Sequence, residues 1–288
     1  MNITLSAPDD AILIQPPVYH PFSSAVLDNG RRLVESELKY ENGAYSIDFD
    51  DFEAKIVSEN VKLFILCSPH NPVGRVWTEA EIRHMGEICL SRGVTVVADE
   101  IHCDFVLPGY RHTPFLNACP ELAENTILCT APSKTFNLAG LQCSNIFIPG
   151  AALRDKFTRE TALTGYSGLN PMGMAAAKAA YLHGEEWLNA LQAYLADSLS
   201  FAEEFFAEKL PKVKVVRPEG TYFAWVDFSG TGLSPEEINL RIVNRAKLWL
   251  DDGAIFGKSG EYFQRIVLAC PRETLREALG RLAEAFSD

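Results

Sequence analysis

Short, continuous runs of apolar and β-branched residues recur through the first half of the chain, separated by helical patterns. Strands buried on both faces have this composition, as in a parallel sheet covered by helices. The clearest helix opens with a capping box, Thr78 with Glu81, and stops at Gly93. The alternation predicts a doubly wound α/β domain with a mostly parallel sheet. The expected strands are 11–14, 62–67, 95–98, 126–129 and 145–148, and the expected helices are 48–58 and 78–91.

The regular alternation ends after about Gly165. Helical patterns and strand-like runs then follow without strict order, which predicts a smaller α+β domain. We expect a large domain over residues 1–184 and, over 185–288, a linking helix with the small C-terminal domain. The expected helices are 173–183, 185–209, 235–247 and one from 273 onward, and the expected strands are 213–216, 222–226 and 265–269.

Composition narrows the classes of protein that the chain can represent. Its 288 residues are 47% hydrophobic, enough for one sizeable core or a large core with a smaller one. The net charge of −12 disfavours nucleic acid and anionic membrane surfaces as partners. The sequence shows no secretory signal and no apolar stretch long enough to span a bilayer. Seven scattered cysteines without CxxC spacing indicate neither disulfides nor a metal site, and favour the reducing cytoplasm.

Three polar clusters follow predicted strands directly, and they contain Asn71, Asp99 and Lys134. Ligands of parallel sheets gather at the carboxyl ends of the strands. Taken singly, the clusters have ordinary explanations: a turn, a helix N-cap and a solvated lysine. Their occurrence on consecutive strand ends instead indicates that the three side chains converge on one rim.

These residue types suit a pyridoxal 5′-phosphate (PLP) site. The cofactor's aldehyde needs a primary amine, which only lysine supplies from a side chain. The pyridine nitrogen must stay protonated to act as an electron sink, and this calls for a neighbouring carboxylate. The phenolic oxygen needs a hydrogen-bond donor such as an asparagine amide.

The strings SPHNPVGR, VVADEIHCD and APSKTFNLAGLQ, in this order, resemble fold-type I PLP enzymes of the class I/II aminotransferase family. DEIH, together with APSKTFNLAGLQ and RIVLACPR, is most similar to the MalY/PatB-type C–S lyases. This subgroup shares the absence of an arginine in the stretch 138–142, where many aminotransferases hold the cofactor phosphate. The resemblance covers the chain from about Ala11 to the C-terminus.

By position, the resemblance implies that Lys134 is the Schiff-base lysine, that Asp99 pairs with the pyridine nitrogen and that Asn71 bonds the phenolic oxygen. His102 takes the place where many aminotransferases have a tyrosine at the cofactor.

Four further residues match the family's site. Tyr19 corresponds to the aromatic residue that stacks on the cofactor ring, although an ordinary core aromatic is an equal alternative. Arg265 corresponds to the arginine that grips the substrate α-carboxylate, a bidentate task suited to guanidinium, with a surface ion pair as the alternative. Ser133 and Thr130 are candidates near the phosphate.

The implied activity is β-elimination on cystathionine or cysteine S-conjugates, giving pyruvate, ammonia and a thiol, in a homodimer. Transamination, and a non-catalytic PLP-binding or regulatory protein, remain alternatives. A nucleotide-binding domain is disfavoured, because no glycine-rich loop follows the first strand. Family members also carry an N-terminal segment before the strand matching 11–15, so we expect a truncated large domain with an incomplete phosphate cup.

Overall fold

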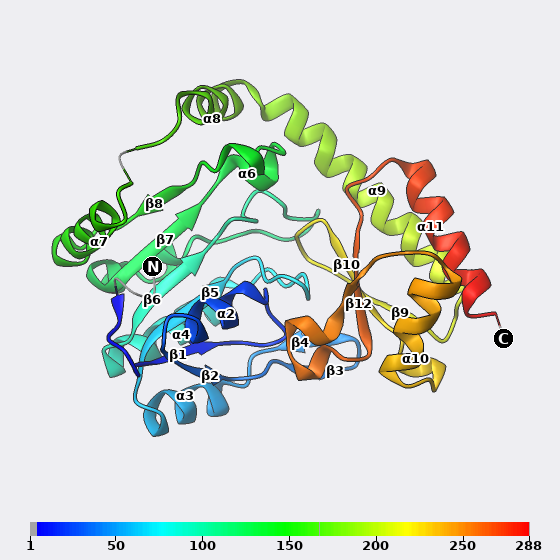
Figure 1. Cartoon of the computed structure of the whole chain (residues 1–288), viewed down its shortest axis with the longest axis horizontal. Helices are drawn as coiled ribbons and strands as arrows, with labels where there is room; N and C mark the ends of the chain where they lie inside the picture. Colours follow the sequence, from blue (N-terminus) through cyan, green and yellow to red (C-terminus); the bar gives the residue numbers. More distant parts are fainter. Residues whose placement is uncertain (1–4, 167, 288) are drawn as a thin grey trace.

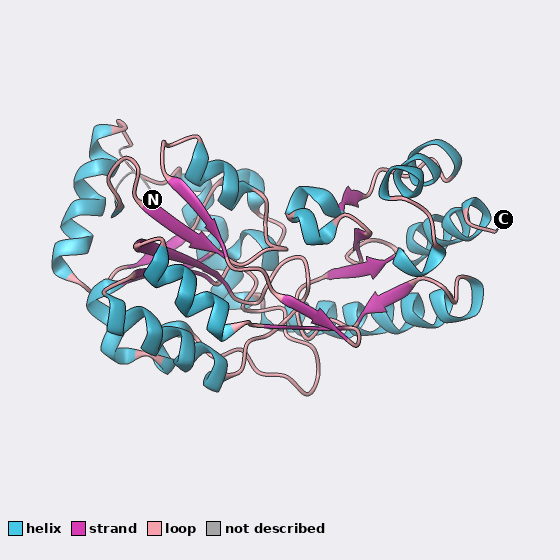
Figure 2. Cartoon of the chain, turned by 90° about the horizontal axis from the view of Figure 1, so that it is seen from below, coloured by secondary structure: helices cyan, strands magenta, loops and turns pink. Residues whose placement is uncertain are grey.

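The computed structural model describes residues 5–166 and 168–287. The two main sheets lie towards opposite ends of the long axis of the molecule (Figures 1 and 2). The long helix α9 (Glu185–Lys209) runs from beside the first sheet to the helices that cover the second (Figure 1). Among the described residues, no helix combines the length and apolar character needed to cross a membrane.

The first sheet has six strands in the order β2-β1-β5-β6-β7-β8, and all pairings are parallel except that of β7 with β8. The prediction of a mostly parallel α/β sheet is therefore confirmed. The edge strand β2 was missed, because a four-residue run with one buried side chain gives little pattern. The strands are β1 (Ala11–Ile14), β2 (Arg32–Glu35), β5 (Val61–Cys67), β6 (Thr95–Asp99), β7 (Thr126–Thr130) and β8 (Asn145–Phe147).

Both faces of this sheet are covered at its centre, which explains why the inner strands β1, β5, β6 and β7 are largely apolar. On β5, Phe64 and Leu66 pack into a cluster with helices α3 and α4, while Ile65 points into a second cluster with α2 and α7. The Thr78 capping box and the left-handed Gly93 are both present at the ends of α4. The helices around the sheet are α2 (Pro21–Leu27), α3 (Phe49–Ser58), α4 (Glu79–Arg92), α5 (Phe115–Ala118), α6 (Pro132–Thr135), α7 (Ala151–Leu163) and α8 (Pro171–His183).

The second sheet is antiparallel, in the order β11-β12-β10-β9, and packs against α9, α10 and α11. The expected helix over 235–247 ends early, because a π-helical turn at Arg241–Arg245 follows α10. The expected strand at 265–269 lies two residues earlier in the chain as β12. The elements are β9 (Lys214–Val216), β10 (Phe223–Asp227), α10 (Pro235–Leu240), β11 (Asp251–Asp252), β12 (Phe263–Val267) and α11 (Arg272–Ala285).

The two sheets are joined through close backbone contacts at Gly74. Its carbonyl accepts hydrogen bonds from the amides of Glu219 (2.8 Å) and Gly220 (2.9 Å). A Cβ at Gly74 would lie 2.5 Å from the side chain of Pro218, and its φ of +76° also favours glycine. The hairpin of β3 (Lys39–Glu41) and β4 (Ala44–Ser46) adds a second link, since the hydroxyl of Tyr40 donates to Asp227. The division at residues 184 and 185 stays a prediction.

Candidate active site

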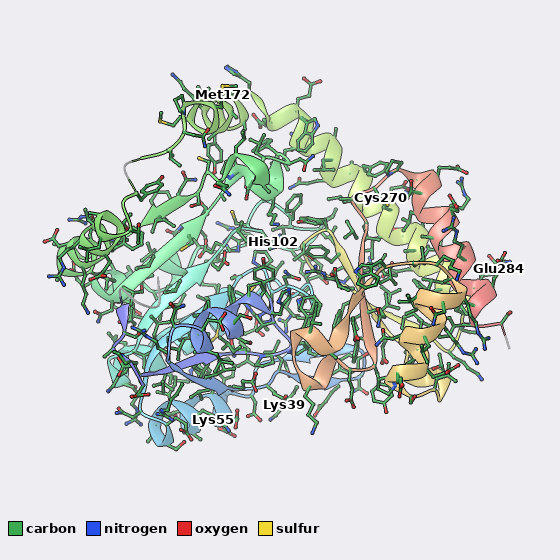
Figure 3. All side chains as sticks on the ribbon, in the orientation of Figure 1. Lys39, Lys55, His102, Met172, Cys270 and Glu284 are labelled. Atoms are coloured by element: carbon green, nitrogen blue, oxygen red, sulfur yellow. The ribbon has the colours of Figure 1, made fainter. Side chains whose placement is uncertain are left out.

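One cavity of about 300 Å³ collects most of the residues that the sequence singled out. It opens where the carboxyl ends of β5, β6 and β7 face the second sheet, and Figure 3 shows His102 in this central position. Its lining residues are Tyr19, His20, Phe22, Cys67, Asn71, Asp99, Ile101, His102, Lys134, Phe223 and Arg265.

The parallel register explains how residues far apart in sequence meet here. Cys67 ends β5 opposite Asp99 at the end of β6, and Asp99 pairs in turn with Cys129 of β7. The chain then enters the short helix α6, whose first turn carries Lys134. The expected convergence of Asn71, Asp99 and Lys134 on one rim is therefore confirmed as geometry.

Asp99 stands partly buried at the cavity wall. Within the ranges that the structure describes, its carboxylate accepts one hydrogen bond, from the amide of Ile101 at 3.2 Å. Burial raises the pKa of Asp99 to about 6, and the positive charge of Lys134 only partly offsets it. A cationic group in the cavity would therefore stabilise the ionised carboxylate.

Lys134 is half-buried and lines the same cavity. Its helix is fixed by Pro132 in the first turn and by the hydrogen bond from the Phe136 amide to the Pro132 carbonyl, 2.9 Å. No described residue forms an ion pair or hydrogen bond with its ammonium group. The amine is consequently available to a ligand in the cavity.

His102 is 4% exposed, and its Nδ1 is buried with no hydrogen-bond partner among the described residues. Its ring contacts Tyr222 and Phe223 at centroid distances of 5.5 and 5.8 Å. Burial, with smaller contributions from the charges of Lys134 and Arg265, lowers the pKa of His102 to about 3. The imidazole is therefore neutral at physiological pH.

Asn71 and Arg265 connect the two sheets across the cavity. Nη1 of Arg265 donates to Oδ1 of Asn71 at 2.7 Å. This contact occupies the amide oxygen of Asn71 and leaves its NH₂ group as the donor for a ligand. Arg265 also pairs with Asp251 at 2.7 Å, but its own side chain is only 13% exposed and lines the cavity, so this is not the surface ion pair of the alternative.

Other predicted site residues are placed less centrally. Tyr19 lines the cavity and is 37% exposed, so the alternative of an ordinary core aromatic is wrong. Ser133 precedes Lys134 in α6, and the hydroxyl of Thr130 accepts a hydrogen bond from Asn145 at 3.2 Å. Neither Ser133 nor Thr130 is among the cavity-lining residues, and their role near a phosphate stays a prediction.

Sequence reasoning missed several lining residues. Cys67 and Ile101 could have been found, because they flank the polar clusters at the ends of β5 and β6. Phe223 carries no such signal: it lies in the apolar strand β10, and the second sheet brings it under the guanidinium of Arg265, 4.1 Å from the ring centroid.

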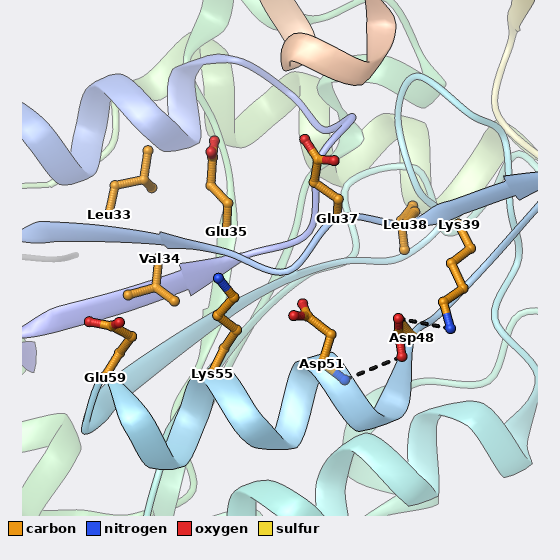
Figure 4. Close-up of a pocket in the computed structure, with 10 residues that line it drawn as sticks. All are labelled: Leu33, Val34, Glu35, Glu37, Leu38, Lys39, Asp48, Asp51, Lys55 and Glu59. Atoms are coloured by element: carbon orange, nitrogen blue, oxygen red, sulfur yellow. Dashed lines mark hydrogen bonds and ion pairs between the residues drawn. The ribbon is translucent and has the colours of Figure 1, made fainter.

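A second cavity, of about 650 Å³, lies between α3 and the segment that includes β2 (Figure 4). Five carboxylates and two lysines line it, and Lys39 pairs with Asp48 at 2.8 Å. Its carboxylates are half-exposed or exposed, and it contains none of the predicted site residues. It therefore takes no part in the site described above.

The donor set of the first cavity fits PLP. A primary amine, a carboxylate with a raised pKa, a neutral imidazole with an orphaned nitrogen and a free amide NH₂ group all border one cavity. These are the groups that an aldehyde, a protonated pyridine nitrogen and a phenolic oxygen require.

Comparisons with known proteins agree with this chemistry. The family model for aminotransferase class I and II matches residues 1–282. Cystathionine beta-lyase PatB of Bacillus subtilis strain 168 is 44% identical over 280 residues, which cover 97% of this chain and 72% of the relative. Protein MalY of Escherichia coli K12 is 30% identical over 280 residues, covering 96% and 70%.

Among solved structures, cystalysin from Treponema denticola, which contains a pyridoxal 5′-phosphate cofactor, superposes with a TM-score of 0.97. It is 36% identical, and the match covers 99% of this chain and 73% of that one. The chain belongs to the class I and II aminotransferase family, in the subgroup that includes MalY and PatB.

Proposed function

We propose that the protein is a PLP-dependent C–S β-lyase, which cleaves cystathionine or cysteine S-conjugates to pyruvate, ammonia and a thiol. One observation carries the proposal: Lys134, Asp99 and Asn71 reach a single cavity from three strand ends, and Arg265 faces them from the second sheet. The similarity to a named cystathionine beta-lyase supports the lyase over other reactions of the family.

The residues would hold the cofactor as follows. Lys134 offers the amine for its aldehyde, and the carboxylate of Asp99 pairs with the protonated ring nitrogen. The NH₂ group of Asn71 donates to the phenolic oxygen, while Tyr19 and His102 border the ring. Ser133 and Thr130 stay candidates for the phosphate.

When bound, the cofactor supplies an electron sink for charge that develops at the substrate α-carbon. Arg265 grips the α-carboxylate with its guanidinium and so orients the α-hydrogen towards Lys134. The amine of Lys134, freed when the substrate amine takes its place at the aldehyde, would take this proton as the general base, and the electron pair left behind would expel the thiolate from the β-carbon. The Lys134 ammonium can then return the proton to the departing sulfur. Water would then hydrolyse the remaining three-carbon fragment to pyruvate and ammonia.

Purified protein loaded with PLP is expected to release pyruvate and a thiol from L-cystathionine in equal amounts. Lactate dehydrogenase coupling measures the pyruvate, and a thiol reagent measures the second product. Amino-group transfer to a 2-oxo acid without pyruvate release would instead assign transamination, for which the same lysine would serve. Cofactor binding without either reaction would favour a non-catalytic PLP-binding or regulatory protein.

We also propose that the chain forms a homodimer. Helix α8 exposes several large apolar side chains, among them Met172 (71% exposed) and Leu182 (63%). Apolar patches of this kind are typical of protein interfaces. The cytoplasmic location stays a prediction from the scattered cysteines.

Sedimentation is expected to give twice the chain mass of 31.9 kDa. The double substitution of Met172 and Leu182 by glutamate should shift the protein to the monomer, because two charges cannot be buried in an apolar interface without partners. Trp249→Glu changes an apolar side chain that is 89% exposed away from α8 and serves as the matched control. A wild-type monomer would contradict the proposal.

A further inference from the structure

Arg265 is held from the side by an acidic residue to which neither the sequence nor the family resemblance pointed. Asp251 lies directly opposite Arg265 in the register of β11 and β12. Its Oδ2 accepts hydrogen bonds from Nε at 3.1 Å and from Nη2 at 2.7 Å. One carboxylate oxygen therefore binds two donors on one edge of the guanidinium.

The remaining sides of the guanidinium are also fixed. Asn71 accepts from Nη1 at 2.7 Å. The rings of Phe223 and Phe256 lie against the guanidinium carbon, with centroids 4.1 and 4.8 Å away. Cation–π contacts of this geometry restrain rotation of the side chain out of its plane. Asp251 is therefore one of four groups that hold the guanidinium. It restrains in-plane rotation by binding the edge formed by Nε and Nη2, while Asn71 binds Nη1.

The donors that remain match a carboxylate. A guanidinium has five N–H donors, and the three contacts with Asp251 and Asn71 use three of them. One N–H is left on each terminal nitrogen, and a pair of this kind can bind the two oxygens of a carboxylate. Without Asp251, Nε and Nη2 would be free to turn towards the ligand in other geometries.

We propose that Asp251 is a positioning residue for recognition of the substrate α-carboxylate: it holds Arg265 so that the two remaining donors face the cavity. This inference rests on the proposed function, which assigns Arg265 to the substrate carboxylate. Asp251 itself is not among the residues that line the cavity. It acts on the substrate through Arg265.

The charge of Asp251 has the opposite effect to its hydrogen bonds. A negative charge beside Arg265 opposes binding of a second carboxylate, so charge alone predicts tighter binding after its removal. The Asp251 side chain is 39% exposed, however, and water screens its charge. Breaking hydrogen bonds to a charged group costs more free energy than the removal of a water-screened charge gains. We therefore expect the lost orientation of Arg265 to outweigh the reduced repulsion of the substrate carboxylate.

The test compares a carboxylate ligand with its amide on the PLP-loaded protein, using L-alanine and L-alaninamide and measuring dissociation constants by calorimetry. Asp251→Ala is expected to weaken L-alanine binding about tenfold, the loss expected when a charged hydrogen-bonding partner is removed. L-alaninamide, which lacks the carboxylate, should change less than about twofold by the same reasoning. Asp251→Asn keeps an acceptor and should give a smaller loss for L-alanine.

Glu273→Gln removes an exposed ion pair with Arg276 and is the matched control, expected to bind both ligands like the wild type. Equal losses of affinity for the two ligands would mean that Asp251 has only a structural role. Unchanged or tighter binding of L-alanine would mean that Asp251 does not orient Arg265. Either result overturns the proposal. Because L-alanine has no β-leaving group, it cannot undergo the elimination, so its dissociation constant and the release of pyruvate from L-cystathionine are separate measurements. Absence of pyruvate from the wild type would overturn the lyase function and leave this inference standing.

Discussion

Replacing Lys134 by alanine is expected to lower the rate of pyruvate formation by about a thousandfold or more, since one side chain supplies both the attachment of the cofactor and the general base. Among the residues that the structure describes, no second lysine lines the cavity, so none of their amines can take over either task. The same substitution should remove the absorbance band of the covalent linkage to the cofactor. Steady-state assays and absorbance spectra of the two purified proteins measure these effects.

Lys62→Ala is the matched control, because it removes an exposed lysine at the amino end of β5, opposite the cavity rim, and is expected to leave both the rate and the spectrum unchanged. Lys134→Arg should behave like Lys134→Ala, since a guanidinium keeps the charge but does not condense with an aldehyde. Persistence of the absorbance band in Lys134→Ala would show that the cofactor is attached elsewhere. Full activity in that variant would remove Lys134 from the mechanism.

The sequence predicted the large sheet and the cavity rim because both depend on local pattern. A strand such as β5, buried on both faces, is apolar at nearly every position, and this pattern survives without knowledge of its neighbours. Polar residues directly after such strands then lie at one edge by parallel geometry. Asn71, Asp99 and Lys134 could therefore be grouped from sequence alone.

The parts that could not be predicted depend on contacts between distant segments. Asp251 lies in β11, a strand of two residues, and only the antiparallel register with β12 brings it to Arg265. Phe223 belongs to an apolar strand like any other, and its place under the guanidinium follows from the packing of β10 against β12. Neither a two-residue strand nor the pairing of strands far apart in sequence has a local signature.

Replacing Asp99 by asparagine is expected to lower turnover by roughly tenfold to a thousandfold, because an opposite charge within contact distance shifts a pKa by about 1 to 3 units. Asparagine has nearly the shape of aspartate but no charge, so it cannot keep a ring nitrogen protonated. The contact of Arg265 with Asn71 is not touched, and KM should therefore change little. Initial rates over a range of L-cystathionine concentrations separate the two constants.

The same substitution is expected to stabilise the cofactor-free protein at neutral pH. Burial raises the pKa of Asp99 from an ordinary 3.8 to about 6, so the folded state holds a proton that the unfolded state has already lost between these values. Stability of the wild type therefore falls as the pH rises through this window and stays lower above it. Asparagine does not titrate, so Asp99→Asn avoids this loss.

The full shift corresponds to about 3 kcal/mol, since one pKa unit is worth about 1.4 kcal/mol. Water in the open cavity screens part of this cost, and we expect a gain of about 2 kcal/mol for Asp99→Asn at pH 7 that shrinks towards pH 4. Urea unfolding of the two cofactor-free proteins at pH 4, 5, 6 and 7 measures the difference directly. Glu273→Gln, which neutralises an exposed carboxylate, is measured alongside as the control. A difference in the free energy of unfolding between wild type and Asp99→Asn that stays constant from pH 4 to pH 7 would contradict this prediction. It would mean that the Asp99 carboxylate ionises in the folded protein without cost, and that the cavity does not favour a cation beside it.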